Sequence, residues 1–274
     1  MLQLSVKRQT WRRHDPDRDE ADEAYLRARM DRVRKDQFTC QGCGFVSSGE
    51  SKERNDTLRR SGFLEVHHVD DDHTNNHLSN LRTVCPFCHQ VFHCGNAGHR
   101  GAGHIVYLPF ISQARLNLLV NACAITAARD ETFADDAKDL LRWLTDYGRV
   151  EIQGLFGAEA TDASVFGSAL MELAGSDPEA YKNRGKTLSG VRLMPDMAYY
   201  DRYIQYWAEQ QTCLPYEKNW DGLAKQFHRS VMSYIQSLQK KEEKPPKSSL
   251  QKMHLRTFAQ EQKAAKTGKR ARKS

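Results

Sequence analysis

The sequence has 274 residues, of which 39% are hydrophobic and 28% charged, and its formal net charge is +6. A chain of this length can bury one substantial core or two small ones. It has no run of 18 apolar residues and no recognisable signal peptide, which argues against a membrane-spanning helix and against export. Seven cysteines, an odd number, favour a reducing compartment, so we expect a soluble, cytoplasmic protein.

The basic excess lies at the C-terminal end. Residues 240–274 contain 12 Lys or Arg and 3 Glu, a net charge of +9, which leaves −3 for residues 1–239. Such a tail can attract nucleic acid or an acidic membrane surface, and DNA is one partner that the sequence suggests. The alternative is a solvated, disordered end that only aids solubility.

In chain order, residues 2–9 alternate weakly between apolar and polar and predict a short strand. Asp15 and Pro16 then suit the cap and first turn of a helix that runs to about Lys35. The thin apolar stripe of this helix predicts that it lies over the next module rather than inside it. Residues 1–36 form the first of four predicted regions.

The next region contains two Cys-x-x-Cys pairs: Cys40 with Cys43, and Cys85 with Cys88. Each pair predicts a tight turn that points two thiolates at one tetrahedral zinc ion, about 2.3 Å from each sulfur. Gly42 and Gly44 would ease the first turn by adopting positive φ. The repeated spacing favours one structural zinc site over four reduced core cysteines. Three further cysteines lack such a partner and are interpreted as free thiols: Cys94, Cys123 and Cys213.

Histidines form a second group of candidate ligands. His89 and His93 are four residues apart, so on a helix they project from one face and can share a metal ion. His67 and His68 are adjacent, so on a strand they point to opposite faces and only one of them needs to bind that ion. The remaining histidines of this region are interpreted as surface or loop residues: His73, His77, His99 and His104.

These residues, together with Asn80, resemble the HNH, or ββα-metal, nuclease motif. The resemblance implies that His67, His89 and His93 hold a catalytic divalent ion (Mg²⁺, Mn²⁺ or Zn²⁺). It also implies that His68 is the general base and that Asn80 fixes the loop geometry. The ion would polarise a phosphate oxygen. Small zinc modules can keep this shape while only binding protein, so both interpretations stay open. Residues 37–110 are the predicted HNH-like zinc-binding module.

Later elements are predicted from periodicity and from breakers. The glycine-rich residues 95–103 predict a flexible loop, and residues 104–109 predict a strand that ends at Pro109. Helices are predicted at 112–127, 133–147 and 163–173, after Asp177-Pro178, from Met194-Pro195 through Trp207, and at 220–239. The predicted class is therefore α+β: an HNH-like zinc-finger module, a helical domain over residues 111–239, and a basic, disordered tail over residues 240–274.

Four segments resemble a more specific family: residues 38–45, 74–81, 105–109 and 191–195. They are similar to the IcmJ/DotN family of type IVB (Dot/Icm) secretion systems, and the similarity runs through most of residues 1–210. The resemblance implies a zinc-binding cytoplasmic adaptor subunit of a secretion or conjugation coupling complex. Such a subunit docks on the tail of a DotL-like coupling ATPase, beside other coupling-complex subunits, at the inner face of the inner membrane.

The sequence thus supports two hypotheses of different classes. The first is an adaptor whose zinc is structural and whose helical domain binds a partner. The second is a metal-dependent HNH endonuclease that cleaves DNA with His68 as general base. Features spread along the chain support the adaptor, whereas a single complete motif supports the enzyme.

Overall fold

The structure is a computed structural model that describes residues 2–6, 18–47, 60–130, 133–210, 227, 229–234 and 236–237. The chain divides into two compact units, residues 1–227 and residues 228–274. In the second unit the described residues are helical, and they fall within the helix predicted at 220–239. Cys213 and the basic tail lie outside the described residues. The predicted division into four regions stays a prediction.

The first unit combines helices with two separate antiparallel sheets of two strands each. In one sheet β1 (Glu65–His68) pairs with β2 (Leu81–Val84), with Glu65 opposite Val84 and His68 opposite Leu81. In the other, β3 (Gly103–Tyr107) pairs with β4 (Val191–Pro195). The mixture of helices and small antiparallel sheets confirms the predicted α+β class. No helix in the described ranges is long and apolar enough to cross a bilayer.

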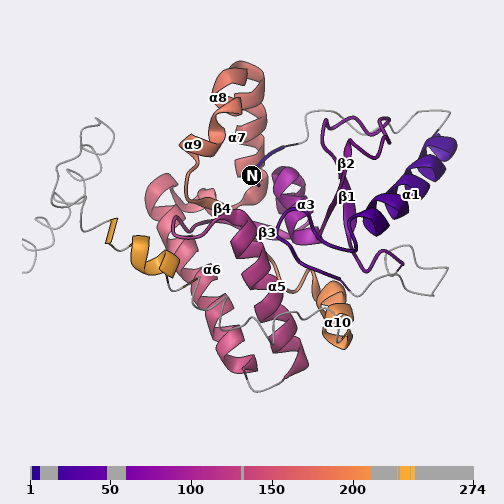
Figure 1. The fold of residues 1–274 in the computed structure, drawn as a ribbon. Coiled ribbons are helices and arrows are strands. Elements are labelled where there is room, and N and C mark those ends of the chain that lie inside the picture. Colours follow the sequence, from indigo (N-terminus) through magenta and orange to yellow (C-terminus); the bar gives the residue numbers. More distant parts are fainter. Residues whose placement is uncertain are drawn as a thin grey trace, which may run out of the picture. The chain divides into compact units, whose positions relative to one another are not determined.

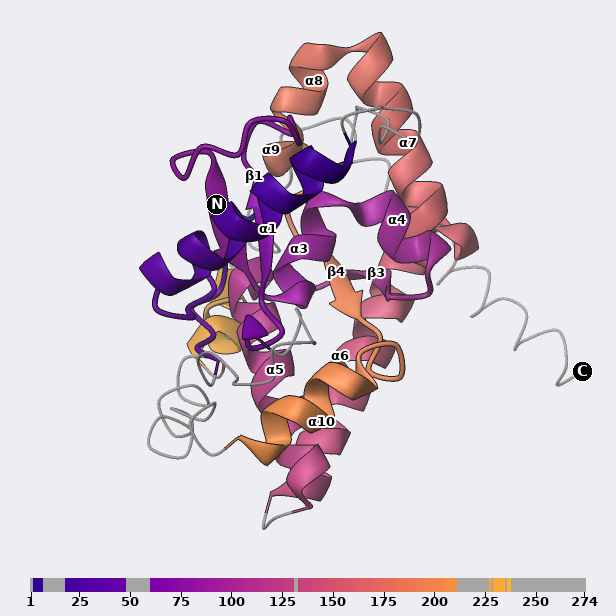
Figure 2. The same cartoon turned by 90° about the vertical axis from the view of Figure 1, so that its right-hand side faces the viewer.

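Helix α1 (Arg18–Lys35) lies over the β1–β2 sheet, as its thin apolar stripe predicts (Figures 1 and 2). Within α1, Val33 is fully buried and Arg29 is only 7% exposed. The Arg29 guanidinium donates hydrogen bonds from Nη2 to Ser61 Oγ at 2.9 Å and to the Leu64 carbonyl at 2.8 Å. These bonds satisfy a buried cation and tie α1 to the start of β1.

Beyond the first sheet, α5 (Gln113–Arg129) and α6 (Ala134–Phe156) run side by side (Figure 1). Ser112 caps α5 as predicted, because its Oγ accepts a hydrogen bond from the Arg115 amide at 3.4 Å. Helix α6 continues nine residues beyond the predicted end at residue 147. The chain then forms a series of short elements: η1 (Ala158–Thr161), α7 (Ala163–Ser176), α8 (Pro178–Lys182) and α9 (Arg184–Thr187).

The glycine-rich segment is not a flexible loop, contrary to the prediction. Its first part belongs to α4 (Cys94–His99), and its end begins β3. The glycines are needed because α4 packs closely against α7 (Figure 2). A Cβ on Gly98 would lie 2.0 Å from the Ser164 amide nitrogen, and a Cβ on Gly167 would lie 2.4 Å from the Gly95 Cα. Glycine in this segment therefore permits a helix contact.

Two other expectations are wrong. Residues 2–6 form no strand; instead Ser5 bonds through its backbone to Val91 and Cys94, at the end of α3 (Pro86–Phe92) and the start of α4. The remainder of the predicted strand, residues 7–9, lies in a part that the structure does not describe. Met194-Pro195 does not start a helix, because both residues belong to β4, where pairing with β3 satisfies their backbone groups.

The helix predicted from Met194 begins instead at Asp201, as α10 (Asp201–Glu209). Its aromatic side chains pack into the core beneath the first sheet. Trp207 is fully buried, contacts the Phe45 ring at 4.8 Å and donates from Nε1 to the Gly62 carbonyl at 3.1 Å. Tyr200 meets the Phe87 ring at 4.8 Å. Core packing, the default expectation for these aromatics, is confirmed for both residues.

We expect Gly167→Ala to lower the free energy of unfolding by about 1–3 kcal/mol, because the new methyl group has no room against α4. Chemical denaturation measures this change. Gly175→Ala is the matched control on the same helix, since nothing lies within 4 Å of the position that its methyl group would occupy and alanine favours helix. Equal stabilities for the two variants would contradict the close contact between α4 and α7.

Candidate metal centres

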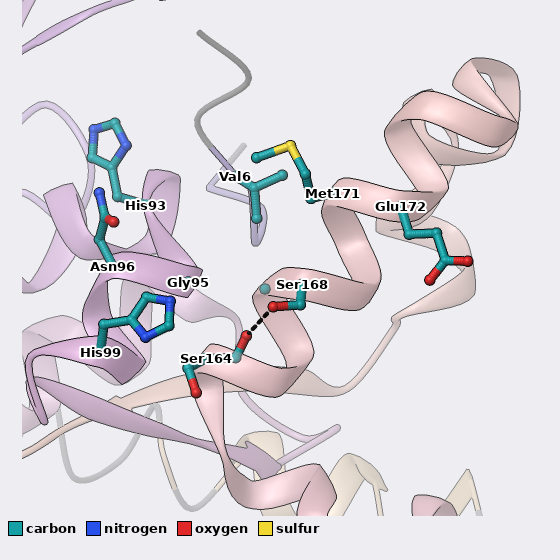
Figure 3. A pocket seen from close by; sticks show the side chains of 10 residues that line it. Val6, His93, Gly95, Asn96, His99, Ser164, Ser168, Met171 and Glu172 are labelled. Carbon is teal, nitrogen blue, oxygen red and sulfur yellow. Dashed lines mark hydrogen bonds between the residues drawn. The ribbon is translucent and has the colours of Figure 1, made fainter. Parts of the chain in front are cut away.

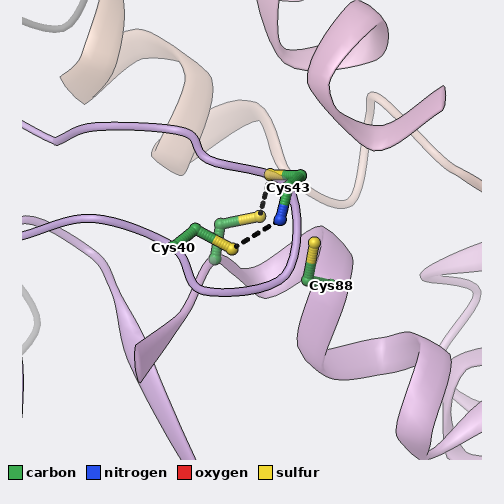
Figure 4. Close-up of side chains that lie close together, drawn as sticks. Cys40, Cys43 and Cys88 are labelled. Atoms are coloured by element: carbon green, nitrogen blue, oxygen red, sulfur yellow. Dashed lines mark hydrogen bonds between the residues drawn. The ribbon is translucent and has the colours of Figure 1, made fainter. Parts of the chain in front are cut away.

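The four predicted cysteines come together in one cluster (Figure 4). Cys40 and Cys43 lie on a turn before β1, whereas Cys85 and Cys88 lie at the N-terminal end of α3. All four sulfurs are within 4.8 Å of one another, and the Cys43 and Cys85 sulfurs are 3.8 Å apart. Tetrahedral thiolates bound about 2.3 Å from one zinc ion stand about 3.8 Å apart. The cluster therefore fits the dimensions of a zinc site.

Local backbone geometry explains the first pair. The Cys40 amide donates to the Phe45 carbonyl at 2.7 Å, the Gly44 amide donates to the Cys40 carbonyl at 2.8 Å, and Gly44 has φ of +83° as expected. Gly42 is needed for a different reason than the predicted positive φ. A Cβ at this position would lie 2.7 Å from Leu2 Cδ1 and 3.0 Å from the Cys88 sulfur, so glycine makes room for the second pair.

The pKa values of Cys40, Cys85 and Cys88 are shifted in different directions. Burial raises the pKa of Cys40, but hydrogen bonds from Cys43, Cys85 and Cys88 outweigh burial and hold that pKa well below its ordinary value. Burial, followed by hydrogen bonds with the other three cysteines, raises the pKa of Cys85 well above its ordinary value. Hydrogen bonds with Cys40 and Cys43, followed by burial, raise the pKa of Cys88 in the same direction. A metal ion that displaces the remaining protons would relieve this crowding, because thiolates are the ligating form.

A second cluster joins β1 to α3. His67, His89 and His93 each offer a ring nitrogen, and these nitrogens lie within 4.8 Å of one another. The Nε2 atoms of His89 and His93 are 3.2 Å apart. Two nitrogens that bind one tetrahedral zinc at about 2.0–2.1 Å stand about 3.3 Å apart. Three imidazoles thus fit a divalent transition ion, and their role as its ligands stays a prediction.

Glu65 orients this cluster and was not assigned a role from the sequence. Its Oε2 lies 2.5 Å from His89 Nδ1, so the carboxylate accepts the Nδ1 proton and holds the ring with Nε2 turned toward His93. Burial raises the pKa of Glu65, but the His89 charge and hydrogen bond prevail and lower it overall. The signal was available, because residues two apart on a strand, here Glu65 and His67, point to one face.

His67 is held neutral by its surroundings. Burial, followed by the positive charge of His89, lowers the pKa of His67 to about 3. Its ring stacks on Phe92 with centroids 4.0 Å apart and an angle of 5° between the planes. A neutral, fixed imidazole is the form that binds metal.

His68 points away from this cluster and is enclosed. It is 3% exposed, its Nε2 lies 3.0 Å from Asn76 Oδ1, and its ring stacks on Tyr25. Asn80 closes the same loop: its Nδ2 donates to Asp70 Oδ1 and to the Asn75 carbonyl, and its Oδ1 accepts from the Asp70 amide. The hydrogen bonds of Asn80 agree with a loop-fixing role, whereas the burial of His68 leaves little access for a water or a substrate.

Two cavities border the histidine cluster. One, of about 380 Å³, lies between α4 and α7, where Asn96 and His99 face Ser164 and Ser168, and His93 is part of its lining (Figure 3). The other, of about 440 Å³, includes His67 among its lining residues. His99 is exposed, as expected, and also lines the first cavity, whereas His104, expected at the surface, lies half-buried in β3.

Fold and clusters together define an α+β protein with two candidate metal centres on a strand–strand–helix unit. The chain is similar to the type 4 apparatus protein DotN of Legionella pneumophila (strain Philadelphia 1). The two are 29% identical over 211 residues, which cover 76% of this chain and 89% of DotN. No protein-family model matches the chain. The similarity supports the resemblance to the IcmJ/DotN family that the four sequence segments indicate.

We expect Cys40→Ser and Cys85→Ser to lose bound zinc and to unfold the module, because metal binding supplies much of the folding free energy of small zinc modules. Elemental analysis and circular dichroism measure the two effects. Cys94→Ser is the control, since Cys94 is buried outside the cluster and its sulfur lies 3.7 Å from the Ala163 carbonyl. Retained structure after removal of zinc by a chelator would contradict a structural metal.

Proposed function

We propose that this chain is a zinc-binding adaptor subunit of the coupling complex of a type IVB secretion or conjugation machine. In this role it docks on the tail of the coupling ATPase. The observation that carries the proposal is the similarity to DotN along 89% of that protein's length. A similarity over 211 residues is much longer than the segment that holds the cysteine pairs, so it includes a large part of the helical region.

The cysteine cluster supports a structural use of zinc in this adaptor. Three of its residues, Cys40, Cys85 and Cys88, are almost fully buried, with exposures of 1%, 0% and 0%. The four cysteines supply all the ligands that a tetrahedral ion takes, which leaves no position for a substrate and is typical of structural rather than catalytic zinc. The ion would hold the turn of the first pair against α3. The histidine cluster would take a second divalent ion.

Exposed apolar side chains on α6 support a protein partner. Trp143 is 44% exposed and Val150 67%, and because they are seven residues apart they lie on one face of α6, whereas other residues of the helix are buried against α5 and β3. Large apolar groups left at a surface are typical of protein-binding faces. We assign the ATPase tail to this face of α6, where an apolar stretch of the tail would cover these side chains.

The endonuclease is less well supported by the geometry. A general base must reach the proton that it removes, directly or through one water. His68 is buried, its Nε2 is engaged with Asn76, and its ring lies against Tyr25. The motif is complete in sequence, but the hydrogen bond between His68, its proposed general base, and Asn76 in the following loop occupies the ring nitrogen Nε2.

The first test is capture of the coupling ATPase tail by the full-length protein, in cells that carry the surrounding secretion genes. We expect the parent to retain the tail and Val150→Asp to retain at least about fivefold less, because a charge would lie in the apolar contact. Val69→Asp is the matched control, since Val69 is 51% exposed in the turn after β1, away from α6. No retention by the parent would overturn the adaptor. Equal retention by both variants would show that the tail docks on a part of the protein other than this face of α6.

The second test is plasmid nicking with Mg²⁺, Mn²⁺ or Zn²⁺ added to the purified protein. An adaptor should leave the plasmid intact with each metal, and His68→Ala should behave as the parent does. Metal-dependent cleavage by the parent that disappears in His68→Ala would instead establish the endonuclease and show that the loop opens around His68.

A further inference from the structure

Helix α5 carries three polar side chains on a face that is buried in the protein. Gln113, Asn117 and Asn121 follow one another at intervals of four residues, which places them on one face of the helix. They are 4%, 0% and 0% exposed. A buried amide is costly unless its polar atoms find hydrogen-bond partners. The partners of these amides therefore indicate why an otherwise apolar face contains them.

Two of the amides point at the cysteine cluster. Asn117 donates from Nδ2 to the Cys88 sulfur at 3.3 Å, and Asn121 donates from Nδ2 to the Cys85 sulfur at 3.8 Å. In the first cysteine pair a backbone amide, that of Cys43, donates to the Cys40 sulfur at 3.5 Å. The second pair, by contrast, receives donors from side chains of a different element.

The backbone of β4 fixes the direction of these bonds. The Leu193 amide can only donate, and it donates to Gln113 Oε1 at 2.9 Å. Gln113 Nε2 therefore faces the other way, and it donates to the Leu193 carbonyl and to Asn117 Oδ1, both at 2.8 Å. Because the oxygen of Asn117 already accepts from Gln113, its NH₂ group is turned toward Cys88.

Asn121 has no such second partner. Within the described residues, no hydrogen-bond partner reaches its Oδ1, which is buried. An apolar residue of similar size would avoid this unsatisfied acceptor. The hydrogen bond from Asn121 Nδ2 to the Cys85 sulfur is the interaction that offsets this cost.

A cluster of four thiolates on one Zn²⁺ ion carries a formal charge of −2, and a buried charge needs compensating donors. Hydrogen bonds from outer partners also hold metal ligands in place and tune their affinity. The positions of Asn117 and Asn121 meet both requirements for the two sulfurs that α3 supplies.

We propose that Asn117 and Asn121 are positioning residues of the cysteine metal centre, and that Gln113 links this centre to β4. Their amide N–H groups stabilise the thiolates of Cys88 and Cys85, so that α5 helps to retain the ion while the cysteines alone bind it. This inference rests on the proposed occupancy of the cluster by zinc.

The test uses full-length protein loaded with Co²⁺, whose thiolate charge-transfer absorption reports only sulfur-bound metal and ignores any ion on the histidines. Decay of this band in excess EDTA gives the rate of metal loss. We expect Asn117→Leu and Asn121→Leu to lose metal about 10–100-fold faster, because an outer partner of a metal ligand typically contributes that much to affinity. Asn121→Asp, which replaces the donor by a carboxylate, should lose metal at least as fast.

Cys123→Ala is the matched control. Cys123 is fully buried on the same helix, and burial alone raises its pKa to about 12, without a contribution from the four clustered thiols. We expect this variant to melt earlier than the parent but to lose metal at the parent's rate. Asn121→Leu should still fold, since it removes an unsatisfied acceptor.

The outcomes separate the two proposals. A parent that shows no thiolate band and no bound zinc overturns the metal centre itself. A metal-loaded parent and folded variants that lose metal at one common rate overturn only the positioning role. A loss rate that follows melting temperature across all variants, with Cys123→Ala included, also overturns that role, because the asparagines would then act through stability alone.

Discussion

The convergence of four sulfur atoms is the constraint on which this structure depends. Two of them sit on a turn before the first sheet and two on α3 after it, so the whole β1–β2 unit is closed between them. The same arrangement has β1 beside α3, where the three imidazoles come together and Glu65 bonds to His89. The two clusters therefore share one strand–strand–helix framework.

The sequence indicated which cysteines and histidines would come together, because the spacing of candidate ligands is a local pattern. Cys-x-x-Cys and two histidines four residues apart can be recognised without any knowledge of the tertiary fold, and α5 with its Ser112 cap could be predicted from periodicity. The boundaries of elements that depend on contacts between distant residues could not be predicted in this way. Val191–Pro195 becomes a strand only because Gly103–Tyr107 lies beside it, and residues 94–99 form a helix whose glycines permit the close approach of α7.

The outer partners of the ligands were the hardest to foresee. Glu65 lies two residues before His67, but its role in orienting His89 can be recognised only when the fold places the His89 ring beside it. Asn117 and Asn121 lie about thirty residues beyond the second cysteine pair, and their four-residue spacing marks one helix face but not the sulfurs that this face meets. The access of water or substrate to His68 likewise depends on its burial, which no local sequence pattern indicates.

One consequence concerns how separable the module is. Trp207 and Tyr200 come from the far end of the first unit, yet they fill the space between Phe45, Phe87 and the Gly62 carbonyl. A fragment that ends at residue 110 would expose Phe45, Phe87 and the Gly62 carbonyl to solvent, because it lacks the aromatic side chains that cover them. Residues 37–110 are thus not an independent structural module, because part of their core is supplied by residues near the C-terminal end of the first unit. The two segments have to be transferred together when the protein is recombined or engineered.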